Sequence, residues 1–308
     1  MKKRYYLMAL MSLLGIFLLM GCQKAPSQKT KGLSIVTSFY PIYAITQEVA
    51  GDLNDVRMIH SSQGIHGFEP SPGDLTAIGK ADVFVYHSRT LESWTKNFKE
   101  VFKDEKVKLL EASEGLPLQK VEGLEDVKVM KGMDKKALYD PHTWLDPVLA
   151  GKEAKHIASE LGKIDPKNKA TYQKNAEAFA NKADQLSAKM AKRFSKTKAK
   201  TFVTQHTAFA YVASRYGLKQ LGLAGISDDI EPNSRRMGEL TDFVKENKVK
   251  TIFAEPQTSP KSAKTLAHAT GAKVKRLDPL ERDPENKKSY LENLQSNLEV
   301  IAQDLEER

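Results

Sequence analysis

The sequence has 308 residues, with 48 Lys and Arg against 39 Asp and Glu, a formal net charge of +9 and a single cysteine. One cysteine excludes a disulfide framework and a thiolate zinc finger. The basic residues are spread along the chain without interleaved aromatic residues, which argues against nucleic-acid binding and favours a solvated, lysine-rich surface. The length and composition fit one large or two medium globular domains.

The only cysteine, Cys22, directly follows an uncharged stretch at residues 5–21, and three basic residues precede that stretch. A basic start, an apolar middle and a small residue at the break form a secretory signal. With the cysteine, it resembles the bacterial lipobox, in which the cysteine carries diacylglycerol on its sulfur and becomes the mature N-terminus. A membrane-spanning helix is the alternative, but it needs roughly 20 apolar residues. We therefore predict a lipoprotein signal peptide at residues 1–21 and lipidation of Cys22.

Residues 22–32 are polar and have no apolar period, which predicts a flexible tether. Short β-rich runs then alternate with helical patterns, as is typical of a parallel sheet in an α/β lobe. The predicted strands are Leu33–Thr37, Val56–Ile59, Val83–Tyr86 and Val107–Leu110. The predicted helices between them are Tyr43–Ala50 and Leu91–Phe102.

A long helical pattern begins at Asp165, with Asp as the N-cap and Pro166 in the first position, and runs to about Ser195. Its apolar residues recur at steps of three and four: Tyr172, Ala176, Phe179, Ala183, Leu186, Met190 and Phe194. Such a helix would be about 45 Å long, which suits a rigid strut between two lobes. A coiled-coil dimer is the alternative, but the seam is rich in alanine. We expect a monomer.

The alternation of strands and helices resumes after this helix. The strands are predicted at Thr201–Thr204, Leu218–Leu223, Thr251–Ala254 and Lys273–Leu277, and the helices at Ala208–Arg215, Ser234–Asn247, Ser262–Thr270 and Lys287–Leu305. The predicted fold is therefore α/β: two Rossmann-like lobes, at 33–164 and 197–308, joined by one long rigid helix at 165–196.

Three of the seven histidines have unusual settings. His66 lies in a loop bounded by Gly and Pro, His142 lies between two Asp-Pro steps, and His206 follows the end of a predicted strand. Ligands of open α/β sheets bind outside the carboxyl ends of strands, and imidazole is a common ligand of zinc. Each histidine alone is more often structural, however, and no spacing matches a zinc finger or a His-Glu-x-x-His helix. The residues alone leave the question open.

The other histidines and both tryptophans receive structural interpretations. His60 and His87 end apolar strands and are expected at an edge or in the core, whereas His156 and His268 lie on amphipathic helices and are expected to face solvent. Trp94 and Trp144 are expected in the core, with Trp144 near enough to His142 to shield it.

The run His-Thr-Trp-Leu-Asp-Pro at residues 142–147 resembles the His-x-Trp-Leu-Asp-Pro signature of the cluster A-I solute-binding lipoproteins. These proteins bind zinc or manganese for ABC importers. Further motifs fit the family in the same order, among them Ser38–Pro41, Glu69–Pro72, Ile230–Asn233 and Leu277–Leu280. Within the family, the chain is most similar to the streptococcal laminin-binding zinc lipoproteins.

The resemblance implies a metal site in the cleft between the lobes, with His66, His142, His206 and Glu281 as ligands. Asp278 is the reserve candidate for the fourth ligand, although its place before Pro279 is typical of a turn. Three imidazoles and one carboxylate suit Zn²⁺, whereas manganese members present two histidines and two carboxylates. Glu255 and Asp278 are the expected partners that orient the ligands.

The resemblance also implies a function: a receptor, not an enzyme, that is lipid-anchored at the extracellular face of a Gram-positive membrane and delivers zinc to an ABC permease. A manganese receptor and a zinc metallohydrolase are the alternatives, and laminin binding is a compatible second role. Many zinc members carry a His-rich loop, but residues 119–139 contain no histidine. A metal-gathering surface protein could take over that task. No nucleic-acid partner is expected.

Overall fold

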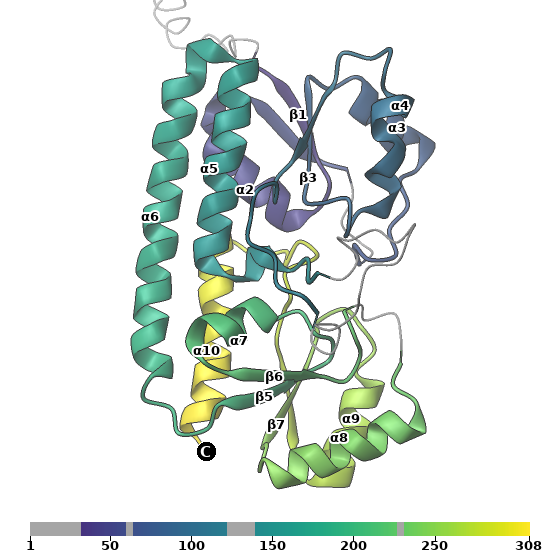
Figure 1. Cartoon of the computed structure of the whole chain (residues 1–308), viewed down its shortest axis with the longest axis vertical. Coiled ribbons are helices and arrows are strands. Elements are labelled where there is room, and N and C mark those ends of the chain that lie inside the picture. Colours follow the sequence, from purple (N-terminus) through teal and green to yellow (C-terminus); the bar gives the residue numbers. More distant parts are fainter. Residues whose placement is uncertain (1–31, 60–63, 122–138, 227–230) are drawn as a thin grey trace, which may run out of the picture. The chain divides into compact units, whose positions relative to one another are not determined.

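The computed structural model describes residues 32–59, 64–121, 139–226 and 231–308. Two four-stranded sheets, each with helices packed beside it, form an upper and a lower lobe in Figure 1. The first sheet has the order β2-β1-β3-β4 and the second the order β6-β5-β7-β8, and every strand pair is parallel. The predicted α/β fold with two Rossmann-like lobes is confirmed.

All eight predicted strands are present, and their ends lie within one residue of the predicted ends. The strands are β1 (Ser34–Thr37), β2 (Asp55–Met58), β3 (Val83–Tyr86), β4 (Lys108–Glu111), β5 (Thr201–Thr204), β6 (Lys219–Gly222), β7 (Thr251–Ala254) and β8 (Lys273–Arg276). The inner strands β3 and β7 are buried along their whole length, whereas the edge strand β8 carries three basic residues. Continuous apolar runs are typical of strands covered on both faces, and charged residues protect exposed edges.

The helices agree with the sequence prediction in the second half of the chain better than in the first. They are α2 (Tyr40–Ala50), α3 (Pro72–Gly79), α4 (Phe98–Val101), α5 (Pro147–Ile164), α6 (Lys169–Phe194), α7 (Ala210–Tyr216), α8 (Ser234–Glu246), α9 (Lys261–Thr270) and α10 (Tyr290–Glu306). The helix predicted at Leu91–Phe102 is only a 3₁₀ turn, Ser93–Asn97, followed by the short α4. The buried Glu92 carboxylate accepts hydrogen bonds from the backbone amides of His87 and Ser88, which holds a tight turn instead of a regular helix.

The prediction of how the long helix begins was wrong. A 3₁₀ turn comes first, α6 begins at Lys169, and the Asp165 side chain makes no cap; it accepts a hydrogen bond from the Tyr172 hydroxyl at 2.8 Å. The Asp-Pro cap occurs instead at Asp146, whose carboxylate accepts the amides of the first turn of α5. The sequence analysis did not predict α5, and it left α3 out as well.

One apolar core joins the two lobes. The long helix α6 lies along α5 and contacts both α2 of the first lobe and α10 of the second (Figure 1). All seven apolar residues predicted for its stripe are buried. All of them except Ala183 belong to a single cluster that includes Ile35 and Val85 of the first sheet as well as Phe202 and Phe253 of the second. One face of α6 is buried along the helix's length of about 39 Å, so α6 connects the two lobes rigidly.

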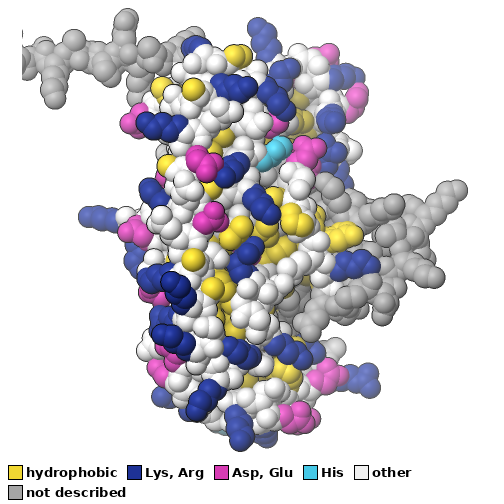
Figure 2. Space-filling model, turned by 60° about the vertical axis from the view of Figure 1, so that its left-hand side comes forward, with side chains coloured by type: hydrophobic (Ala, Val, Ile, Leu, Met, Phe, Trp, Pro, Cys, Tyr) yellow, Lys and Arg dark blue, Asp and Glu magenta, His cyan; other side chains and the backbone are white. Residues whose placement is uncertain are grey.

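The face shown in Figure 2 is mixed in charge and carries a group of hydrophobic side chains near its middle. Lys and Arg side chains are spread over the face shown in Figure 2, with Asp and Glu side chains between them. None of the helices in the described ranges combines the length and the apolarity that crossing a bilayer requires.

A close approach of α5 and α6 generates a stability prediction. A Cβ atom at Gly151 would lie 3.2 Å from the Cα of Ala180, whereas one at Gly238 in α8 would meet nothing within 4 Å. We expect Gly151→Leu to force the helices apart and to lower the free energy of unfolding by about 2 kcal/mol. Gly238→Ala should raise it by about 0.5–1 kcal/mol through helix propensity. Urea denaturation of the metal-free protein measures both changes, and a Gly151→Leu protein as stable as wild type would contradict this packing.

Candidate metal centre

Four connecting segments, each from a different part of the chain, contribute one side chain to a common site. His66 lies between β2 and α3, His142 directly precedes the 3₁₀ turn that leads into α5, His206 lies two residues beyond β5, and Glu281 lies between β8 and α10. Their ligating atoms all lie within 4.8 Å of one another. Parallel strands direct their carboxyl ends, and the loops that follow them, toward one edge of each sheet. The structure thus brings together the four side chains that were predicted as ligands, and whether they bind a metal stays a prediction.

The distances in this cluster fit a tetrahedral ion. The Nε2 atom of His142 lies 3.2 Å from that of His66 and 3.4 Å from that of His206. The Oε1 atom of Glu281 lies 3.4 Å, 3.6 Å and 3.2 Å from the Nε2 atoms of His66, His142 and His206, respectively. A zinc ion with bonds of about 2.0–2.1 Å separates its ligands by about 3.3–3.4 Å. Five of the six separations are therefore close to those of a tetrahedral zinc site.

The carboxylate of Glu281 supports the same interpretation. Glu281 is 4 % exposed, and its Oε1 faces the imidazole nitrogens of His66, His142 and His206. A buried carboxylate is costly unless protonated neighbours or a cation compensate its charge. Its position beside three imidazole nitrogens makes it a suitable metal ligand.

Two carboxylates orient the imidazoles from behind. Asp140 accepts a hydrogen bond from Nδ1 of His142 at 2.7 Å and another from its backbone amide at 2.8 Å. Glu255, directly after β7, lies 2.5 Å from Nδ1 of His206. Each contact fixes a proton on Nδ1 and leaves the lone pair of Nε2 directed at the cluster, which is the usual arrangement around a bound metal. The sequence analysis anticipated Glu255 in this position but missed Asp140.

These carboxylates also change the affinity of the imidazoles for protons. Burial lowers the pKa of His142, but Asp140 and Glu281 outweigh burial and raise it above the usual value. Burial likewise lowers the pKa of His206, yet Glu255 and Glu281 raise it well above the usual value. Burial raises the pKa of Glu281, whereas the three neighbouring histidines bring it well below the usual value. When no cation is bound, protons on the imidazoles therefore compensate the negative charge of the buried carboxylates.

Asp278, the reserve candidate for the fourth ligand, lies outside the cluster. Its carboxylate accepts the backbone amide of Leu280 at 2.8 Å, which closes the turn expected before Pro279. Burial is the main cause that raises the pKa of Asp278 to about 6, and the nearby Glu255 and Glu281 add to it. The side chain shapes the loop that carries Glu281.

The remaining sequence interpretations have mixed outcomes. His87 is fully buried and hydrogen-bonds Thr143 at 2.8 Å, and Trp144 is fully buried against His142, as expected. His268 is exposed, but His156 is half-buried, with its Nε2 shielded from solvent. Trp94 is likewise half-buried and packs against the aromatic core of the first lobe. Three subjects of the sequence analysis lie wholly or largely outside the described residues: Cys22, His60 and the segment at 119–139.

The model of the ZnuA family, described as zinc-uptake complex component A periplasmic, matches residues 35–304. The chain belongs to this family. Zinc-binding lipoprotein AdcA of Streptococcus pneumoniae is 37 % identical over 98 % of this chain and 61 % of its own length. High-affinity zinc uptake system protein ZnuA of Bacillus subtilis is 37 % identical over 91 % of this chain and 90 % of its own length. The chain thus spans about three fifths of AdcA and most of the Bacillus protein.

Solved structures of family members show the same architecture. A Zn(II)-bound variant of AdcAII from Streptococcus pneumoniae matches with a TM-score of 0.84 and 57 % identity over 89 % of this chain and 99 % of that one. The laminin-binding protein Lmb of Streptococcus agalactiae, described as bifunctional with adhesin and metal transporting activity, matches with a TM-score of 0.81 and 55 % identity over 89 % of this chain and all of that one. The resemblance to the cluster A-I lipoproteins is confirmed.

The raised imidazole pKa values generate a prediction for the metal-free protein. Because the pKa of His206 is higher in the folded chain than in the unfolded one, its ion pair with Glu255 stabilises the fold fully below the unfolded value of about 6.5. This stabilisation is lost as the pH rises through the raised pKa. We expect the melting temperature of the chelator-treated protein to fall as the pH rises above about 6.5, and to fall less steeply in Glu255→Gln. An equally steep fall in the variant would contradict this assignment.

Proposed function

We propose that this chain is the extracytoplasmic receptor of a zinc importer: it captures Zn²⁺ and delivers it to an ABC permease. The convergence of three Nε2 atoms and Glu281 Oε1 at separations near 3.3 Å carries the proposal. In this assignment His66, His142, His206 and Glu281 are the metal ligands. The names of two relatives, one zinc-binding and one of a zinc uptake system, support the choice of ion.

The donor set argues for zinc over manganese. Zinc accepts four ligands in a tetrahedron and binds imidazole well, whereas manganese prefers more ligands, most of them oxygen. Here three of the four donors are nitrogens. His142 and His206 are almost completely buried, which leaves little room for the additional water ligands that manganese would need.

Four protein ligands also argue for a receptor and against a hydrolase. Catalytic zinc keeps one coordination position open for water or substrate, whereas a four-ligand site is closed. A closed site can bind and hand over the ion itself but offers no position for a reacting group. Zinc is the cargo here.

Capture and release follow from the chemistry of the cluster. Zinc binding requires neutral Nε2 atoms, so the ion displaces the protons that the cluster holds at neutral pH. Asp140 and Glu255 keep both imidazoles correctly oriented before the ion arrives, which lowers the ordering cost of binding. Acidification or displacement of a ligand loop returns the cluster to its protonated state and frees the ion.

We also propose that Cys22 carries a lipid anchor, which would hold the receptor at the extracellular face of a Gram-positive membrane beside its permease. The basic start, the uncharged stretch at 5–21 and the cysteine support this assignment. The AdcA relative is named a lipoprotein, which also supports lipidation of Cys22. The division into a tether at 22–32, lobes at 33–164 and 197–308 and a linker at 165–196 remains part of the same proposal.

Binding of one zinc ion per chain should stabilise the protein. At a thousandfold excess of zinc over its dissociation constant, the free energy of unfolding rises by about 4 kcal/mol. For a chain of this size the melting temperature rises on the order of 10 °C. His206→Ala should lose most of this shift, whereas His268→Ala on the exposed face of α9 should keep it. Metal analysis and calorimetry measure both effects; a stoichiometry of two, or equal shifts in the two variants, would rule out this ligand set.

Laminin binding is a second candidate function, favoured by the 55 % identity to the laminin-binding adhesin Lmb. We expect immobilised laminin to retain the purified protein, and a chelator to leave most of that binding intact if the protein surface itself makes the contact. Binding of laminin only in the presence of zinc would indicate a metal-bridged contact instead. Retention no greater than that of an unrelated lysine-rich protein would exclude this role.

A further inference from the structure

The C-terminal helix α10 has a row of buried polar side chains beside its buried apolar residues. Tyr290, Asn293 and Asn297 follow one another at steps of three and four residues, so they lie on one face of the helix. None is more than 7 % exposed. Burial of polar groups on a helix destabilises the fold unless each group finds a partner, so the partners indicate what the row does.

Two members of the row hold the two loops that carry metal ligands. The Tyr290 hydroxyl donates to the backbone carbonyl of Trp144, two residues after His142. The Asn297 amide donates to the backbone carbonyl of Asp278 at 2.5 Å and accepts from the amide of the same residue at 3.2 Å. One rigid helix therefore holds the His142 loop at one point and the Glu281 loop at another, about two turns away.

The two loops are also bonded to each other. The indole Nε1 of Trp144 donates to the carbonyl of Pro279 at 2.8 Å. Together with Tyr290 and Asn297, this bond closes a ring of contacts that begins and ends on α10. Within the ring, Leu280 adopts a positive φ of 57°, a conformation that a residue with a side chain adopts only when its surroundings impose it. The backbone next to Glu281 is thus fixed by several contacts at once.

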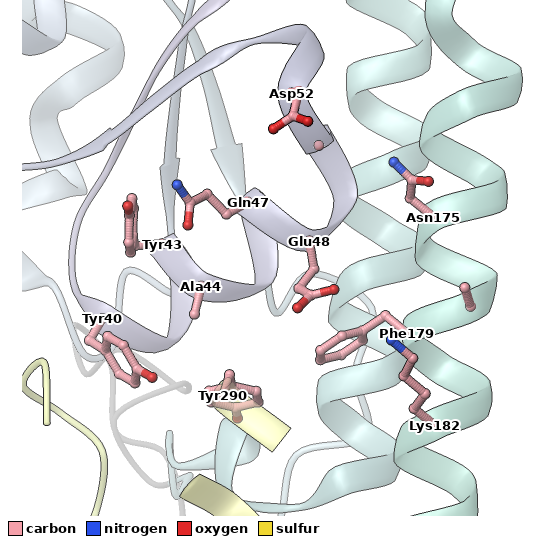
Figure 3. Close-up of a pocket in the computed structure, with 12 residues that line it drawn as sticks. Tyr40, Tyr43, Ala44, Gln47, Glu48, Asp52, Asn175, Phe179, Lys182 and Tyr290 are labelled. Atoms are coloured by element: carbon pink, nitrogen blue, oxygen red, sulfur yellow. The ribbon is translucent and has the colours of Figure 1, made fainter. Parts of the chain in front are cut away.

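The third member ties the row to the first lobe. The Asn293 amide donates to the Tyr40 hydroxyl at 3.2 Å, and the Tyr40 and Tyr290 rings lie 6.4 Å apart. Figure 3 shows Tyr40, Phe179 and Tyr290, from α2, α6 and α10, among the residues that line a groove of about 610 Å³. Since the Tyr290 ring packs against Phe179 at 6.2 Å, loss of its hydroxyl alone would leave this packing in place.

We propose that Tyr290 and Asn297 are positioning residues for the metal site: through Trp144 and Asp278 they set the separation of His142 and Glu281, and with it the tetrahedral geometry that favours zinc. This inference rests on the proposed function. A ligand set held within a few tenths of an ångström binds its preferred ion best, and a loosened carboxylate can open or turn bidentate, which admits more coordinating atoms.

Tyr290→Phe and Asn297→Ala in the full-length chain test the proposal, with zinc and cobalt(II) as probes. Cobalt(II) has intense visible absorption in a tetrahedral site and weak absorption at higher coordination number. We expect both variants to bind zinc at least about 10-fold more weakly and to lose part of the cobalt absorption. Competition with a chromophoric chelator measures the zinc affinity.

The matched controls are Tyr43→Phe, a half-buried tyrosine of the same groove, and Asn175→Ala, whose amide donates to the carbonyl of Val49 at 3.1 Å, away from both ligand loops. Both should keep the affinity and the spectrum of the wild type. Wild-type affinity in either α10 variant would overturn the inference, as would weaker binding with an unchanged cobalt spectrum, which would indicate general destabilisation. A wild-type protein that binds no zinc would instead refute the proposed function.

Discussion

Three imidazole nitrogens and one carboxylate oxygen share a buried space only a few ångströms across, and the rest of the structure depends on that constraint. The carboxylate of Glu281 cannot stay there uncompensated, because an unpaired buried charge costs several kcal/mol. Its neighbours must therefore contribute protons or share a cation with it. No local interaction assembles the cluster, since its members come from four separate loops. Two sheets with a common core bring these loops together.

The strands and the ligands could be predicted from the sequence for different reasons. The strands are short, apolar and separated by helical patterns, so periodicity alone located all eight. The ligands have no local pattern: His66, His142 and His206 are far apart in the chain, and only the motif around His142 pointed to their common role. The local sequence marked each of the three histidines as unusual, and the family resemblance indicated that they act together as metal ligands.

The features that escaped prediction depend on contacts between distant residues. In the sequence, Asp140 is typical of an Asp-Pro turn. Only the structure shows that its carboxylate accepts a hydrogen bond from Nδ1 of His142. The sequences Asp146-Pro147 and Asp165-Pro166 offer the same helix-capping signal. In the structure Asp146 caps α5, whereas the Asp165 carboxylate accepts a hydrogen bond from the Tyr172 hydroxyl. A carboxylate two residues before a histidine, with proline between them, is a signal that could have identified Asp140.

The apolar cluster that runs unbroken from one lobe to the other has a consequence for exchange kinetics. Separation of the lobes would expose the buried face of α6, so that motion is rare on the time scale of loop fluctuations. The lifetime of a bound ion is then set by how often a ligand-bearing loop swings out. In the proposed function, a permease that unloads the ion quickly must act on those loops, because the packed core resists separation of the lobes.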